Sequence, residues 1–68
     1  MTTGETELEM ATRHVAEQEE RIGRQEILIE RLRNAEAPAD DALELLDTMR
    51  TLLETMHTHV ARISYWGD

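Results

Sequence analysis

Positions spaced in alternating steps of three and four, from Leu8 to Leu32 without a slip, are apolar except at Gln18 and Gln25. This spacing places its members on one side of an α-helix, and it is the heptad pattern of helices that pack side by side. The a positions are Leu8, Val15, Ile22 and Ile29, and the d positions are Ala11, Gln18, Gln25 and Leu32. Residues 5–35 are therefore predicted to form a helix that needs a partner helix.

The start of this helix carries a capping box, in which Thr6 is followed three residues later by Glu9. Glutamates also precede arginines by four residues, a spacing that supports ion pairs along the outer side of a helix. The predicted pairs are Glu9–Arg13, Glu17–Arg21 and Glu20–Arg24.

The second half of the chain carries a wider apolar stripe, made of three rows with a spacing of seven residues. The rows are Leu46, Leu53 and Val60 at a; Ala42, Met49, Met56 and Ile63 at d; and Leu45, Leu52, His59 and Trp66 at g. A stripe of three positions in seven is typical of a helix in a bundle with more than one neighbour. Residues 39–66 are predicted to form this second helix.

Between the two stripes, Pro38 cannot donate a backbone hydrogen bond and disfavours helix at Ala37. A turn over residues 35–39 is too short for anything but antiparallel neighbours, so residues 1–68 are predicted to form a single helical-hairpin domain. The alternative is one kinked, nearly continuous helix in a domain-swapped dimer. With the turn centred between Ala37 and Pro38, the expected neighbours are Val15–Val60, Ile22–Leu53, Ile29–Leu46, Glu26–Arg50 and Glu19–His57.

The expected fold class is all-α, an antiparallel hairpin that associates with itself into a dimeric four-helix bundle, with a tetramer as the alternative. A lone hairpin leaves half of each stripe in water, and a C2 dimer is the commonest closed assembly. Gln18 and Gln25 interrupt the seam; they either fix register or oligomer state by hydrogen bonding across chains, or lie at its edge and reach water. The residues expected in the oligomer core are Leu8, Val15, Gln18, Ile22, Gln25, Ile29, Leu32, Leu45, Leu46, Met49, Leu52, Leu53, Met56, Val60 and Ile63.

Composition narrows the function classes. The chain has 15 acids against 7 basic residues, all of them arginine, and a net charge of −8, which disfavours direct binding to nucleic acid. It has no cysteine, no apolar run long enough for a membrane span and no visible export signal, so we expect a cytoplasmic protein. No catalytic set and no glycine-rich phosphate loop is present, so we do not expect an enzyme.

Three histidines and two aromatic residues are the candidate functional groups. His14 and His59, with His57 as a third candidate, come from ends that a hairpin brings together, and imidazoles hold zinc, nickel or copper or respond to pH. The alternative is that they are ordinary surface or partly buried histidines. Tyr65 and Trp66 are expected to cover the open end of the bundle or, alternatively, to anchor a protein partner.

Three segments of the first helix, Arg13-His14-Val15-Ala16-Glu17, Ile22-x-Arg24-Gln25 and Ile29-x-Arg31-Leu32, resemble a loose group of short, uncharacterised bacterial two-helix proteins. Leu45-Leu46 and His57-x-His59 are similar to the second half of that group. The likeness spans about residues 10–63, implies a helical hairpin and attaches no activity; the turn here lacks the glycine of that group. The architecture is also similar to that of plasmid-copy-control RNA-binding hairpin dimers, whose role the acidic surface of this chain does not fit.

These features predict a small, non-enzymatic homo-oligomer that acts through contact with a protein partner, as an adaptor or regulator. A metal- or pH-responsive bundle that uses the histidines is the alternative, and a nucleic-acid regulator is the third possibility.

Overall fold

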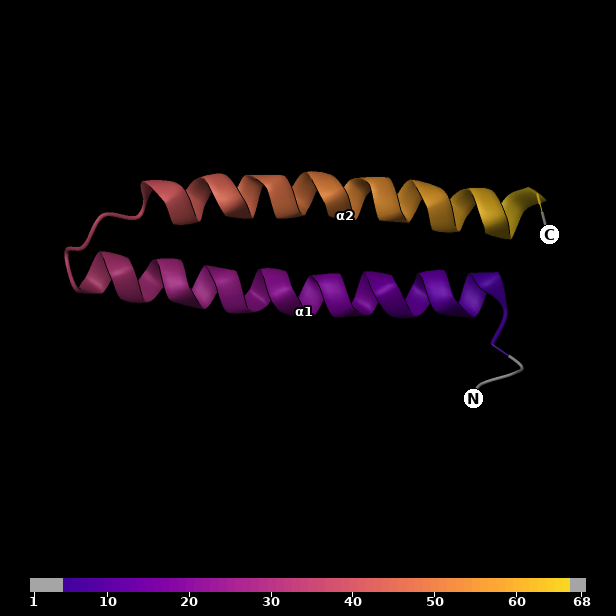
Figure 1. Cartoon of the computed structure of the whole chain (residues 1–68), viewed down its shortest axis with the longest axis horizontal. Coiled ribbons are helices and arrows are strands. Elements are labelled where there is room, and N and C mark those ends of the chain that lie inside the picture. Colours follow the sequence, from indigo (N-terminus) through magenta and orange to yellow (C-terminus); the bar gives the residue numbers. More distant parts are fainter. Residues whose placement is uncertain (1–4, 67–68) are drawn as a thin grey trace.

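The computed structural model describes residues 5–66, which form two α-helices, α1 (Glu7–Asn34) and α2 (Asp40–Trp66). The helices lie antiparallel and side by side, joined by a short link (Figure 1). The predicted hairpin is therefore confirmed for a single chain, and the nearly continuous helix is not found. Within the described part of the chain, neither helix has a stretch that is both long and apolar enough to cross a bilayer.

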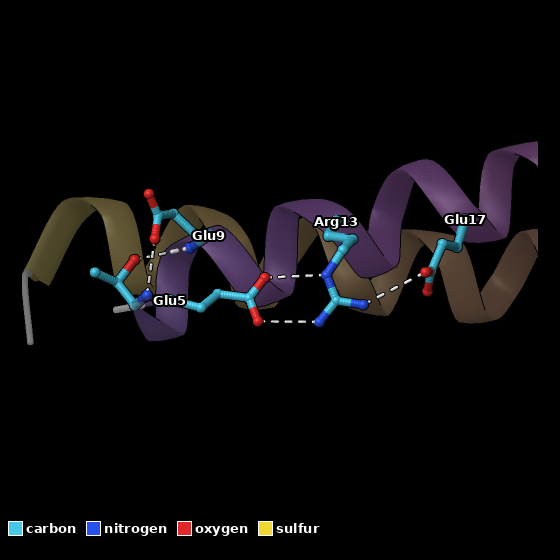
Figure 2. Close-up of polar contacts among 5 residues, drawn as sticks. Glu5, Glu9, Arg13 and Glu17 are labelled. Carbon is cyan, nitrogen blue, oxygen red and sulfur yellow. Dashed lines mark hydrogen bonds and ion pairs between the residues drawn. The ribbon is translucent and has the colours of Figure 1, made fainter. Parts of the chain in front are cut away.

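The predicted capping box starts α1. The backbone N–H of Glu9 donates to Thr6 Oγ1 at 3.0 Å, and the backbone N–H of Thr6 donates to Glu9 Oε1 at 2.9 Å (Figure 2). Two amide groups that would otherwise lack a partner at the helix start are thus satisfied. The predicted surface pair Glu20–Arg24 is also present, with Arg24 Nη2 at 3.0 Å from Glu20 Oε2.

Arg13 does not pair with Glu9 as predicted, because the capping box already holds the Glu9 carboxylate. Arg13 instead donates to both carboxylate oxygens of Glu5, at 3.0 and 3.1 Å, and to Glu17 Oε2 at 3.4 Å (Figure 2). The hydrogen bond from Arg13 lowers the pKa of the Glu5 carboxyl, and the same contact raises the pKa of Arg13. The residue before the cap is thereby tied to the second turn of α1.

The end of α1 is closed by a backbone motif that normally uses glycine. Glu36 has a φ of 56°, in the left-handed region. Its N–H donates to the Arg33 carbonyl at 3.0 Å, and the N–H of Ala37 donates to the Leu32 carbonyl at 2.8 Å. This pair of bonds is the Schellman motif, which satisfies the last carbonyls of a helix and reverses the chain.

The helix α2 begins directly after Ala39. The Ala39 carbonyl accepts the first helical hydrogen bond, which the backbone N–H of Leu43 donates at 2.9 Å. Pro38 thus lies before the helix and not in its first turn. Asp40 and Asp41 occupy that turn, where the positive end of the helix dipole favours carboxylates.

A small core lies between the helices. Ile22 and Ile29 of α1 and Leu46 of α2 are buried together, and Ala42, Met49 and Leu53 pack against them half-buried. Ala11 is also buried, nearer the open end of the hairpin. This core is confined to the a and d rows of both helices.

Gln18 and Gln25 are buried in the seam, with 2% and 9% of their surfaces exposed. The Nε2 of Gln18 donates to the Met49 carbonyl at 3.1 Å, and the Nε2 of Gln25 donates to the Ala42 carbonyl at 2.9 Å. The glutamines therefore hydrogen-bond across the two helices of one chain and do not lie at a wet edge. Each carbonyl has a second lone pair, so it accepts this bond in addition to its helical one.

The register of the hairpin differs from the prediction by about one helical turn. The two residue numbers add to 67 in both glutamine bonds and to 76 in the ion pairs Glu26–Arg50 and Glu19–His57. The midpoint is a total of about 71, whereas a turn centred between Ala37 and Pro38 requires 75. The chain reverses earlier, at Glu36, and the link runs back over the end of α1 before α2 begins (Figure 1). Position a of one helix consequently faces position d of the other.

Replacement of Glu36 by glycine is expected to stabilise the hairpin. Glycine adopts a positive φ without the steric cost that a side chain adds, so Glu36→Gly should raise the free energy of unfolding by about 1 kcal/mol. Chemical denaturation followed by circular dichroism measures this. Glu36→Ala, which removes the carboxylate but keeps the Cβ atom, is the matched control and should show no such gain.

Replacement of Gln18 by glutamate is expected to make stability depend on pH. A carboxylate beside the Met49 carbonyl cannot donate, whereas the neutral acid can, so burial should raise the pKa of the new group above that in the unfolded chain. The folded state then binds the extra proton, and the stability of Gln18→Glu should fall as pH rises through that window. Gln18→Met should lose about 1 kcal/mol at every pH. Parallel pH profiles for the two variants would contradict a donor role for Gln18.

Candidate functional site

The two broad sides of the hairpin differ in chemistry. The e positions of both helices line one side, the e face, where Arg50 Nη2 lies 2.8 Å from Glu26 Oε2 and His57 Nε2 lies 3.9 Å from Glu19 Oε2. Both contacts confirm the predicted charge pairs. The e face is thus mainly polar, and Arg50 and His57 of α2 each lie against a glutamate of α1.

The opposite side, the g face, is apolar and uncovered. We define it by the exposed leucines Leu28 of α1 and Leu45 and Leu52 of α2, which are 44%, 50% and 47% exposed. Met56 and Ile63 extend it toward the open end and are half-buried. Leu45 and Leu52 belong to the part of the α2 stripe that α1 does not cover.

The residues predicted for the oligomer core divide into three groups in the single chain. Those buried within the hairpin are Gln18, Ile22, Gln25, Ile29 and Leu46. Those half-buried are Leu8, Val15, Leu32, Met49, Leu53, Met56, Val60 and Ile63. Leu45 and Leu52 are exposed. The a and d rows therefore pack within one chain, and the g row remains available.

A hollow of about 400 Å³ lies on the g side near the open end of the hairpin. It is lined by His14 and Ala11 of α1 and by Met56, His59 and Arg62 of α2, with the threonines of the same turns. The predicted proximity of His14 and His59 is thus present as a shared cavity. Arg62, which the sequence reasoning missed, could have been found from its position one helical turn beyond His59.

The third histidine does not join them. His57 lies on the e face against Glu19, as expected for residues two apart on a helix. Within residues 5–66, no three histidine or acidic side chains are grouped closely enough to hold a metal ion. One chain therefore offers two imidazoles to a metal, and any further ligand has to come from outside it.

Tyr65 and Trp66 pack edge to face at the end of α2, with ring centroids 5.0 Å apart and planes at 89°. Both are largely exposed, so within one chain they do not cover the open end as expected. The alternative role of Tyr65 and Trp66, as an anchor for a protein partner, stays a prediction.

Comparison of the chain with protein-family models, curated proteins and solved structures found no match to any of them. The candidate site therefore rests on the geometry and chemistry of the hairpin.

Proposed function

We propose that the chain is a non-enzymatic protein that associates with a second copy through the g face, forms a dimeric four-helix bundle and acts through contact with a protein partner. The observation that carries this proposal is the row of exposed leucines on one broad side of a hairpin whose own core is small. An assembly that covers this face with a like face buries the same residues twice.

The dimensions of the hairpin support a dimer. The two helices have 28 and 27 residues, so each is about 40 Å long, and with a diameter of about 10 Å each they give every broad side a footprint of about 800 Å². A stable interface needs about 800 Å² from each partner. The broad side that carries the g face is therefore about the size of one such interface.

In such a dimer, the surfaces left for an unidentified protein partner are the acidic outer sides of the helices and the Tyr65–Trp66 pair. Aromatic side chains are frequent anchors in protein interfaces. A net charge of −8 supports a partner with a basic surface and argues against DNA, RNA or an anionic membrane.

A second candidate is a bundle that responds to metal or to pH through its histidines. The observation that favours it is the cavity that His14 and His59 share. Two imidazoles are half of a tetrahedral zinc site, and nickel or copper accepts the same ligand type.

Replacement of leucines on the g face by glutamate is expected to break the dimer. Leu52→Glu and Leu45→Glu each place a charge in the proposed interface, so light scattering should give a mass that falls from twice the chain mass to that of one chain. Ile27→Glu is the matched control, because Ile27 is equally exposed, at 51%, but lies outside the g face. The proposal is contradicted if the wild-type chain is a folded monomer at 100 µM, or if Ile27→Glu disrupts the assembly as much as the leucine variants do. A mass of four chains would instead correct the stoichiometry to a tetramer.

Calorimetric titration with zinc, nickel and copper tests the second candidate. Binding should be lost when either His14 or His59 is replaced by alanine and should persist in His57→Ala, because His57 lies on the other face. The absence of binding heat for all three metals, together with an assembly state that is unchanged between pH 8 and pH 6, would remove this candidate.

A further inference from the structure

The proposed dimer does not by itself specify how its two hairpins are oriented relative to each other. Two hairpins packed face to face through the g face are related by a two-fold axis in the plane between them. An axis parallel to the helices places the turn of one copy over the turn of the other, and α2 of each copy then packs on α1 of the other. An axis across the helices places each turn over the partner's open end and lays α2 on α2 and α1 on α1. The inference below rests on the proposed dimer and concerns which of these two arrangements forms.

Charges along α2 distinguish the two ends of the g side. Asp41 and Glu44 lie near the turn, and His59 and Arg62 lie near the open end. Each acid precedes its basic counterpart by about five turns of 3.6 residues, so Asp41 lies on the same line along α2 as His59, and Glu44 on the same line as Arg62. The first line runs beside Leu45 and Leu52 and the second runs along the outer edge of α2, so one helix carries an acidic end and a basic end in matching positions.

These groups are available for contact with a second copy. All four are exposed, and within residues 5–66 none of them takes part in an ion pair. The basic end also contains the hollow that His14, His59 and Arg62 line, which is open to whatever packs on the g side. The molecule thus offers exposed acidic side chains at one end of α2 and a hollow lined by basic side chains at the other.

We propose that the second copy lies end over end, so that α2 packs antiparallel on α2 and the acidic turn of each copy fills the basic hollow of the other. Arg62 of one copy then faces Glu44 of its partner, and His59 faces Asp41. The midpoints of the two pairs are residues 53 and 50, so the two-fold axis crosses α2 close to Leu52, which lies near its own equivalent.

The exposed residues of α1 match this arrangement independently. The hairpin register places Leu52 level with the stretch around Glu19, so the two-fold axis crosses α1 there. Met10 of one copy then faces Leu28 of the other, and Arg21 faces Glu17, which also accepts a hydrogen bond from Arg13 of its own chain. Between the two copies of α1, an apolar residue therefore faces an apolar residue and an acidic residue faces a basic one. In the turn-over-turn arrangement, by contrast, the two basic hollows face each other.

Single cysteines in this cysteine-free chain test the direction. A disulfide needs Cα atoms closer than about 7 Å. Under mild oxidation, a mixture of Leu45→Cys and His59→Cys chains should give the 45–59 heterodimer, because these positions lie about equally far on either side of Leu52. A mixture of Leu45→Cys and Leu28→Cys is the matched control, since that pair meets only with turn over turn.

The outcomes separate the two proposals. A dominant 45–59 product, identified by mass spectrometry, supports the end-over-end dimer. A dominant 45–28 product overturns it and leaves the dimer through the g face intact. If the wild-type chain is monomeric by light scattering and neither mixture crosslinks, both proposals fail.

Charge exchange supplies a second test that does not depend on trapping. Glu44→Arg and Arg62→Glu each create two like-charge contacts per dimer and should raise its dissociation constant about 5- to 30-fold. The double variant restores opposite charges and should return to within about threefold of the wild-type value. Glu44→Arg alone reduces the net negative charge, so general repulsion predicts tighter association; tighter association in that variant, or a double variant as weak as the two single ones, would overturn the pairing.

Discussion

Two hydrogen bonds from buried glutamine side chains to backbone carbonyls hold the two helices in one relative position. An apolar seam by itself tolerates sliding, because leucine and isoleucine side chains gain similar contact at several offsets. The Gln18 and Gln25 amides do not tolerate it, since each would lose its acceptor inside the seam and leave a buried polar group unpaired, at a cost of about 1–3 kcal/mol. Their spacing of seven residues matches that of their acceptors, so both bonds form at one offset and break together. The glutamines reduce the apolar content of the core and in exchange define its register.

That fixed register gives the hairpin two unlike sides. Once the a and d rows face each other, the e rows meet on one side with opposite charges, and the g rows meet on the other with leucines and histidines. Arg50 and His57 on the e face already lie against glutamates of α1 and so offer little to a second copy. The leucines of the g face, by contrast, are left exposed within the single chain. The contrast assigns the two sides different roles, one that faces water and one suited to burial, before any partner is considered.

The sequence predicted the elements and their buried positions well. The seam from Leu8 to Leu32 contained every residue of α1 that is buried, the capping box formed as expected, and the charge pairs across the e face were correct. The register was missed because a heptad pattern matches itself at several offsets, and residue types on α2 do not signal which backbone carbonyl will accept a side-chain amide. The Arg13 contacts were missed for a different reason: Glu9 was counted as a free carboxylate although its capping role already used it. The shared cavity of His14 and His59 followed from the hairpin alone, because it needed only the two ends to meet.

The left-handed backbone at Glu36 has a bearing on whether the chain folds back or exchanges helices with a neighbour. In a continuous rod Glu36 would be helical and its strain, about 1–2 kcal/mol, would be relieved. The same rod would have to carry Pro38 in its interior, which costs about 3 kcal/mol and disfavours helix at the preceding residue. The local backbone terms therefore favour reversal by about 1–2 kcal/mol before any side chain packs. Glu36 and Pro38 thus have opposing backbone preferences. The difference between them sets the free-energy margin between a hairpin that folds back within one chain and a chain that exchanges helices with a neighbour.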